Sequence, residues 1–127
     1  MAEKVAKFRF LGYKVLESSI KVCEEPIKDA HLSVHFHQEI GYNEDEQKMR
    51  LVLTSKINDD KSLVDIEIKT VGIFEYDKTI TPLERDNFFR VNAPAILFPY
   101  VRAYVSSLTA LSGINPITLP TLNLSKQ

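Results

Sequence analysis

Residues 92–124 constrain the fold of this chain most, because they carry a single charge, Arg102, in thirty-three residues. Within this stretch, apolar side chains recur every three or four positions, which lines one face of a helix. The members of the series are Leu97, Val101, Tyr104, Leu108 and Leu111. The pattern predicts an amphipathic helix that must bury one side against another layer of the fold.

Local signals place the two ends of this helix. Pro94 stands where the first turn of a helix tolerates proline, with Asn92 or Ala93 as the expected cap. Gly113 is expected to end the helix in the left-handed conformation, and Pro116 prevents its resumption.

Prolines also shape the interior of the stretch and the segment after the helix. Pro99 lies inside the apolar pattern, so it either kinks the helix or marks its true start, with residues 93–98 as a lead-in. Residues 114–124 are apolar and punctuated by prolines, which predicts neither a helix nor a regular strand. An extended apolar segment beside an amphipathic helix is a candidate wall for a groove.

The first half of the chain alternates in the manner of β-strands. Residues 7–25 are expected to be extended, with slips in parity around Gly12 and near Ser18-Ser19 that indicate a bend or bulge. After His31 the alternation is regular and predicts a strand with one buried face. Its two sides are Leu32, Val34 and Phe36 against His31, Ser33, His35 and His37.

Two further strands and a short helix complete the predicted elements. We expect strands over residues 48–57 and 62–76, joined by a short hairpin loop at residues 58–61. Parity breaks at residues 70–72, which predicts a bulge in the last strand. Thr81 and Glu84 form a capping box that predicts a helix over residues 82–90.

The order of these elements predicts the fold class. Four strands precede the helices without β–α–β alternation, so the sheet is expected to be antiparallel within an α+β domain. The helices would pack on one face of the sheet and cover its apolar side chains. With 127 residues and no internal repeat or linker, the chain is expected to be one domain, residues 1–127.

Composition excludes several classes of function. Hydrophobic residues make up 44% and charged residues 26% of the chain, which is typical of a folded globular protein. The net charge of −1 provides no basic surface for nucleic acid or an anionic membrane. No segment approaches the roughly 20 apolar residues that span a bilayer, and residues 1–10 are too charged for a signal peptide. The lone Cys23 fits a reducing cytoplasm.

Enzymatic and metal chemistry also find little support. His35 and His37 share one side of a strand and could be two ligands of a zinc ion. Zinc sites usually have three or four protein ligands, and His31 is the one other histidine of the sequence, so we reject a metal site. The acidic residues cluster in turns or on outward strand faces, where solvated charge is expected. Ser106 and Ser107 lie mid-helix without the sharp turn of a catalytic serine. The four glycines are scattered and form no phosphate loop, so we expect no enzyme and no cofactor.

Apolar surface remains as the candidate functional feature. A groove between sheet, helix and loop would bind extended, non-native polypeptide by burying apolar area at about 25 cal/mol per Å². The alternative, which the residues alone favour, is that the same side chains are simply core. The candidate wall residues are Leu32, Val34, Phe36, Ile68, Tyr100, Tyr104, Leu119, Leu122 and Leu124.

The same part of the chain resembles a known family. The run APAILFPYVR at residues 93–102, followed by a helix, a glycine and LPTLNL, is similar to the C-terminal half of SecB, the bacterial export chaperone, which carries a closely similar PNILFPYAR run. Residues 71–74 resemble the glycine-isoleucine-phenylalanine step of that family, and residues 8–26 resemble its first strand. The resemblance extends over nearly the whole chain, and the ILFPY run is its specific part.

This resemblance implies a fold, a site and an assembly. In SecB-like proteins the matching positions help to form hydrophobic channels that bind unfolded clients, and helices meet in a dimer of dimers. The chain stops at Gln127, about where the second long helix of the family begins, so we expect a more open groove or different clients. Glu67 matches one acidic position of the family's contact surface for the export motor SecA. Ser19 and Cys23 stand where that surface has acids.

The resulting hypothesis is an ATP-independent holdase in the cytoplasm that binds unfolded or precursor polypeptides for export, as a homodimer or homotetramer. Its partners would be these clients and either SecA or an antitoxin, without nucleic acid or membrane insertion, and the sequence leaves open whether SecA is bound. One alternative is a dedicated chaperone of an antitoxin or another single partner, a role that some SecB-like proteins have. Another is a domain that binds a small apolar ligand.

Overall fold

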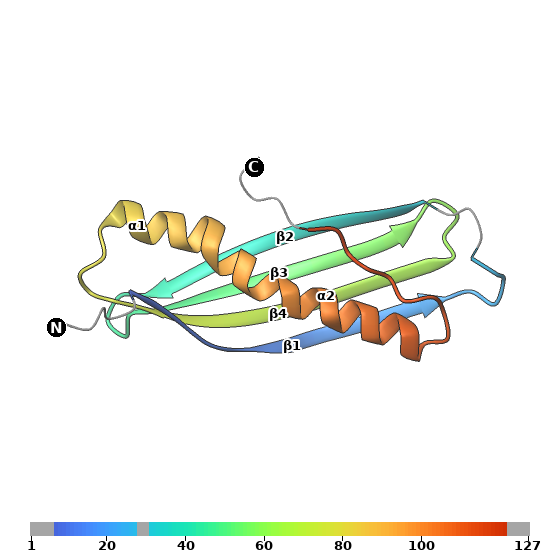
Figure 1. Cartoon of the computed structure of the whole chain (residues 1–127), viewed down its shortest axis with the longest axis horizontal. Coiled ribbons are helices and arrows are strands. Elements are labelled where there is room, and N and C mark those ends of the chain that lie inside the picture. The colour runs from blue at the N-terminus through green and yellow to red at the C-terminus, as the bar shows by residue number, and fades with distance from the viewer. Residues whose placement is uncertain (1–6, 28–30, 122–127) are drawn as a thin grey trace.

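The structure of the protein is a computed structural model and describes residues 7–27 and 31–121. Four long strands form one antiparallel sheet in the order β1-β4-β3-β2, so β1 and β2 are its edges (Figure 1). The helices follow the strands and cross one face of the sheet (Figure 1). The predicted α+β architecture is therefore confirmed. The strands are β1 (Phe8–Val22), β2 (Leu32–Asn43), β3 (Lys48–Asp59) and β4 (Val64–Tyr76).

The face of the sheet beneath the helices, here called the inner face, carries most of the core. Alternate residues of the two central strands point to this face and are almost fully buried, which is the period-two burial that the sequence predicted. They are Met49, Leu51, Leu53, Ile57, Val64, Ile66, Ile68 and Phe74. The opposite face, here called the outer face, carries most of the charged side chains of the strands.

Strand β1 contains two one-residue bulges. Its pairing with β4 shifts at Leu11 and again at Leu16, so each of these leucines is an extra residue in the strand. Gly12 follows the first bulge with a φ of 134°, a conformation that favours glycine. The slip predicted around Gly12 is therefore confirmed, while the second falls at Leu16 rather than at Ser18-Ser19.

The bulge predicted in the last strand is wrong. Strands β3 and β4 pair without any shift from Lys48 opposite Glu75 to Asn58 opposite Asp65. Residues 70–72 broke the apolar alternation because Val71, which points to the outer face, is also buried, with 6% of its surface exposed. A buried residue on both faces of a central strand gives the same pattern as a bulge.

The helical region is one uninterrupted run rather than two separate helices. The capping box at Thr81 starts α1 (Pro82–Asn87), a π-helical stretch η1 (Phe88–Asn92) follows, and α2 (Ala93–Leu111) continues directly. Asn92 has helical φ and ψ angles of −73° and −45° and makes no side-chain capping bond. The predicted cap at Asn92 or Ala93 is therefore wrong, because the turn before Pro94 is already helical.

Pro99 lies inside α2, so the helix starts before it and residues 93–98 are not a separate lead-in. The end of α2 is as predicted: Gly113 follows with a φ of 87° in the left-handed region. Within the described residues, no helix is long and apolar enough to cross a membrane.

Helix α2 packs on the middle of the inner face. Leu97, Val101 and Val105 are buried against the sheet with at most 1% exposure. Gly72 makes this approach possible, because a Cβ atom there would lie only 3.3 Å from Cδ1 of Leu97 and 3.1 Å from Cε2 of Phe74. After α2 the chain turns back across the sheet toward β2 (red in Figure 1), and Leu119 enters the core.

The φ angle at Gly12 leads to a first prediction. Gly12→Ala should lower the free energy of unfolding by about 1–3 kcal/mol, because alanine rarely adopts a positive φ. Gly41→Ala is the matched control, since Gly41 lies in a strand without a positive φ and nothing lies within 4 Å of an added Cβ. Urea unfolding measures both. Equal destabilisation of the two variants would contradict the conformational argument.

Candidate binding groove

A hollow lies at the end of the sheet where β1 finishes, and it has a volume of about 670 Å³. One wall is the chain that leaves β1, residues 22–27, together with Leu32 at the start of β2. The other wall is the segment after α2, residues 112–118. Val64 at the start of β4 also lines the hollow.

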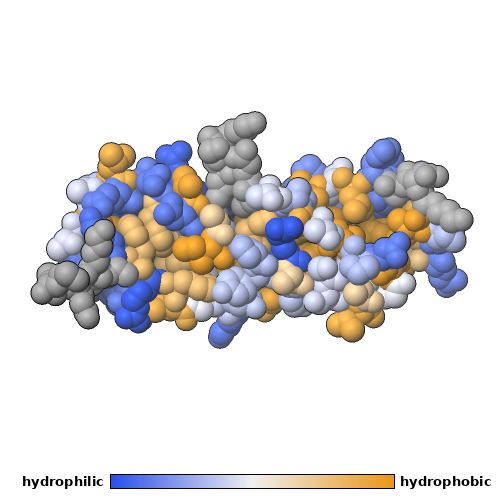
Figure 2. Space-filling view, in the orientation of Figure 1, coloured by the Kyte–Doolittle hydropathy of each residue, from blue (hydrophilic) through white to orange (hydrophobic). Residues whose placement is uncertain are grey.

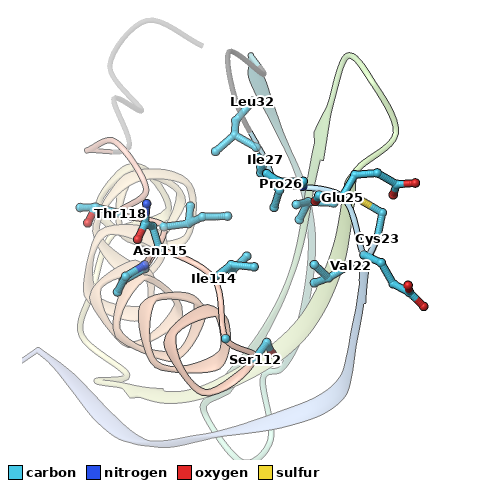
Figure 3. Close-up of a pocket in the computed structure, with 15 residues that line it drawn as sticks. Val22, Cys23, Glu25, Pro26, Ile27, Leu32, Ser112, Ile114, Asn115 and Thr118 are labelled. Carbon is cyan, nitrogen blue, oxygen red and sulfur yellow. Dashed lines mark hydrogen bonds between the residues drawn. The ribbon is translucent and has the colours of Figure 1, made fainter.

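Apolar side chains from the two walls point toward each other across this groove. Figure 3 shows Ile27 and Leu32 on the sheet side and Ile114 on the side of the helix, with Val22 across from Ile114. Leu32 is 44% exposed and Val22 is 36% exposed, so these side chains are available to a ligand. A polypeptide that enters here would cover apolar surface that the protein leaves open to water.

A buried threonine holds the second wall against α2. The Thr109 hydroxyl donates to the carbonyl oxygen of Val105 at 2.8 Å and accepts from the backbone N–H of Ile117 at 2.9 Å. Thr109 itself is fully buried. The hydroxyl therefore satisfies a backbone donor of an irregular segment, which fixes the distance between the loop and the helix.

The charged residues among those lining the groove are carboxylates. Glu24 and Glu25 lie on the β1 side, and within residues 7–27 and 31–121 no lysine or arginine lines the groove. Cys23 stands between the end of β1 and these two glutamates in the sequence, and its thiol donates to the backbone oxygen of Glu25 at 3.4 Å. Burial raises the pKa of this thiol, and the side-chain carboxylate of Glu25 raises the pKa further. At neutral pH the thiol is therefore protonated and weakly nucleophilic.

A second hollow of about 530 Å³ continues the groove past the β3–β4 turn and shares Val22, Cys23 and Val64 with it. Asp59 shapes this turn, because its carboxylate accepts from the backbone N–H groups of Lys61, Leu63 and Val64. Burial raises the pKa of Asp59, but these three donors outweigh burial and hold the pKa below its usual value.

The structure distributes the predicted wall residues over several places. Leu32 lines the groove. Ile68 and Leu119 are buried in the core, with at most 1% exposure, and present no surface to a ligand. Val34 and Phe36 are half-buried on the inner face of β2, where the ring of Phe36 meets Phe98 edge-on at 5.2 Å.

The two predicted tyrosines lie on the other side of α2, above β1. The ring centroid of Tyr100 is 4.5 Å from that of Tyr13 and 5.6 Å from that of Phe10. Tyr100 remains 40% exposed. Tyr104 is half-buried one turn further along the helix. Leu122 and Leu124 lie outside the described residues.

Three groove residues were not among those predicted from the sequence: Val22, Ile27 and Ile114. Pro26 did mark the end of the first strand, and the segment after the helix was expected to form a wall. The side chains on the exit from β1 were missed because nothing in their spacing shows that this exit meets the end of α2.

Glu67, the predicted contact for SecA, points to the outer face. Its carboxylate lies 4.0 Å from the ammonium group of Lys56, so the charge is balanced by a neighbour on the next strand. His35 and His37 are on the same face, and His37 lies 3.4 Å from a carboxylate oxygen of Glu39. Among residues 7–27 and 31–121, no three His, Cys, Asp or Glu side chains gather in a way that could hold a metal ion.

Comparison with known proteins identifies relatives over most of the chain. The sequence model of SecB, described as preprotein translocase subunit SecB, matches residues 15–126. An uncharacterized protein of Methanocaldococcus jannaschii is 33% identical over 124 residues, which cover 92% of this chain and 79% of that protein. A protein-export protein SecB of Orientia tsutsugamushi is 26% identical over 125 residues, which cover 98% of this chain and 77% of that protein.

A solved structure shares the fold. A SecB-like chaperone of Mycobacterium tuberculosis, determined in complex with a peptide from the HigA1 antitoxin, superposes with a TM-score of 0.77. The two sequences are 16% identical, and the match covers 92% of this chain and 88% of that chain. The agreement confirms the arrangement of sheet and helices.

The role of Thr109 leads to a second prediction. Thr109→Val should lower the free energy of unfolding by about 1–3 kcal/mol, because the partly buried N–H of Ile117 loses its acceptor. Thr118→Val, at an exposed position of the same segment, should change it by less than about 0.5 kcal/mol. Urea unfolding and hydrogen exchange at the Ile117 amide test this. Unchanged exchange in Thr109→Val would show that the hydroxyl does not hold the wall.

Proposed function

This chain belongs to the SecB family, and we propose that it is an ATP-independent holdase that binds non-native polypeptide in the groove beside Leu32. The observation that carries the proposal is the groove itself: apolar side chains from both walls face an open space of about 670 Å³. Family members named as protein-export SecB support a chaperone role. We place its action in the cytoplasm, before export of the client.

The groove is suited to weak and broad binding. One leucine or phenylalanine side chain that becomes fully buried contributes about 1.5–3 kcal/mol. Two or three such anchors, less the entropy lost when a flexible chain is ordered, give affinities in the micromolar range. Binding of this kind selects for exposed apolar side chains rather than for one sequence, which is what a holdase requires.

The carboxylates of Glu24 and Glu25 add a preference in charge. A client segment that carries lysine or arginine beside its apolar anchors would place those cations near the two carboxylates. The contribution is modest because both glutamates are exposed to solvent. We therefore propose apolar segments flanked by basic residues as the clients bound most tightly.

A dedicated partner is the second candidate. The structural relative from Mycobacterium tuberculosis holds a peptide of an antitoxin. In this chain the outer face is not acidic, because Lys56 balances Glu67, and Ser19 and Cys23 replace acids of the SecA contact surface. This charge balance favours a single protein client over delivery to SecA.

We also propose that the chain forms a homodimer or homotetramer through the solvent side of α2. Exposed positions along this nineteen-residue helix are uncharged, which is unusual for a surface helix. Figure 2, which looks onto the helix side, shows apolar colour over much of this face. The exposed positions are Ala95, Ile96, Pro99, Tyr100, Ala103, Ser107, Ala110 and Leu111.

The holdase proposal gives a third prediction. Leu32→Asp should weaken suppression of aggregation of a reduced, slowly refolding client at least about fivefold, because it places a charge in the groove. Leu83→Asp is the matched control, since Leu83 is 80% exposed on α1, and α1 lies at the opposite end of the sheet from the end of β1 (Figure 1). Light scattering without nucleotide measures both. Full suppression by Leu32→Asp would refute the groove as the client site.

The same assay separates the classes of ligand. Suppression of several unrelated clients at near-stoichiometric ratios supports a general holdase. Suppression of one client alone supports a dedicated chaperone. A folded protein that protects no client, but binds one small apolar compound tightly, would replace both with a ligand-binding domain.

Assembly through α2 gives a fourth prediction. Ala103→Glu should lower the mass of the particle, because it brings like charges together across a symmetric helix contact. Asn87→Glu, at an exposed position of α1, should leave the mass unchanged. Gel filtration with light scattering is the measurement. An Ala103→Glu variant that keeps the native mass would exclude this helix face as the interface.

A further inference from the structure

A second apolar depression lies on the outer face, on the side of the sheet away from α2. It has a volume of about 390 Å³ and lies between the two bulges of β1. Leu11 and Leu16, the two inserted residues, are 40% and 43% exposed at its edges. Val71 and Ile73 of β4 line it from the neighbouring strand. The two bulges thus place leucine side chains on the outer face, which a strand with regular alternation of inward and outward side chains would not do.

The charged residues beside this depression are both cations. Lys14 of β1 and Arg50 of β3 line it, and no carboxylate does among the residues that the structure describes. In the pairing of the strands Lys14 is opposite Val71, and Arg50 is opposite Ile73, so neither faces an acid on β4. Neither cation forms an ion pair with another residue of the described ranges, 7–27 and 31–121.

Other cations of the outer face have an acidic neighbour across the strands. The cross-strand pairs are Arg9 and Lys48 with Glu75, Lys69 with Glu17, Lys21 with Asp65, and Lys56 with Glu67. Charge is therefore balanced over much of this face and left unbalanced at the depression. Among the cations of the four strands, Lys14 and Arg50 are the two without an acidic neighbour directly across the strands, and they lie beside the exposed apolar surface.

We infer that this depression is a docking site for an acidic, extended segment of a partner protein that carries apolar anchors. Apolar side chains two residues apart would enter between Leu11 and Leu16, since alternate side chains of an extended chain share one face. Carboxylates beside them would meet Lys14 and Arg50. The site is separate from the client groove, which opens between β1, β2 and the segment after α2, and it prefers the opposite charge.

A second copy of this chain fits the depression poorly. A two-fold contact through this patch would bring Lys14 and Arg50 of one copy close to the same two cations of the other, because such contacts are self-complementary. The patch provides no acid to separate them. Like charges placed together across an interface oppose association, so the two cations favour an acidic partner over a second copy of this chain.

The test uses two fluorescein-labelled, end-blocked peptides of eight residues, one alternating glutamate with leucine and the other alternating lysine with leucine. Fluorescence polarisation with the full chain should show binding of the glutamate peptide, weakened by salt because the contacts are exposed. The double variant Lys14→Glu and Arg50→Glu should lower its affinity about tenfold.

Matched controls separate this site from its surroundings and from the groove. Lys21→Glu with Lys56→Glu reverses two cations of the same face that already oppose carboxylates, and it should change the affinity less than threefold. Leu32→Asp, the groove variant, should leave the affinity unchanged. Leu16→Ser should weaken binding without changing net charge. Circular dichroism and gel filtration establish that each variant is folded and keeps its native mass.

Several results would overturn the inference. They are absence of binding of the glutamate peptide at millimolar concentration, equal affinity for the two peptides in the Leu32→Asp variant, whose client groove is blocked, or loss of binding of the glutamate peptide in Leu32→Asp but not in the Lys14 and Arg50 variant. A change of particle mass in that double variant would assign the face to a second copy instead. Because the readout is peptide binding rather than suppression of aggregation, failure here leaves the holdase proposal intact, and the reverse also holds.

Discussion

The contact between α2 and the two central strands sets the positions of the surfaces discussed above. Leu97, Val101 and Val105 enter the inner face, and Gly72 leaves the room that Leu97 needs. The position of α2 then fixes Thr109, and through its hydroxyl the segment that forms one wall of the groove. It also determines which side of the helix remains in solvent. A small shift of α2 would therefore alter both the groove and the uncharged helix face.

The sheet separates two surfaces of different chemistry. The groove at the end of β1 combines apolar side chains with the carboxylates of Glu24 and Glu25. The depression on the outer face combines apolar side chains with Lys14 and Arg50. Strand β1 contributes to both, because its end leads into the groove and its bulges turn Leu11 and Leu16 outward. The two proposed sites therefore do not overlap, so a client in the groove and a partner at the depression would not compete.

Much of the fold was predictable because the signals are local. Alternation along β2, β3 and β4 follows from burial of one face, and the capping box at Thr81 and the left-handed Gly113 depend only on nearby backbone. The errors also have physical causes. Val71 is buried on the outer face, which resembled a bulge, and the turn before Pro94 is a π-helical continuation instead of a capped start. Both depend on contacts with residues distant in sequence.

The sequence by itself determined the order of the strands and helices, the face of each strand that is buried, and the resemblance to SecB carried by residues 93–102. These follow from side-chain periodicity, backbone preferences and a short distinctive motif. Only the tertiary structure decided which apolar side chains stay accessible, so that Leu32 lines a groove while Ile68 and Leu119 lie in the core. The physical reason is that the exposure of a side chain depends on what packs against it in the folded protein. The spacing and hydrophobicity of the side chains do not reveal this, because they are the same for residues that line a groove and for residues in the core.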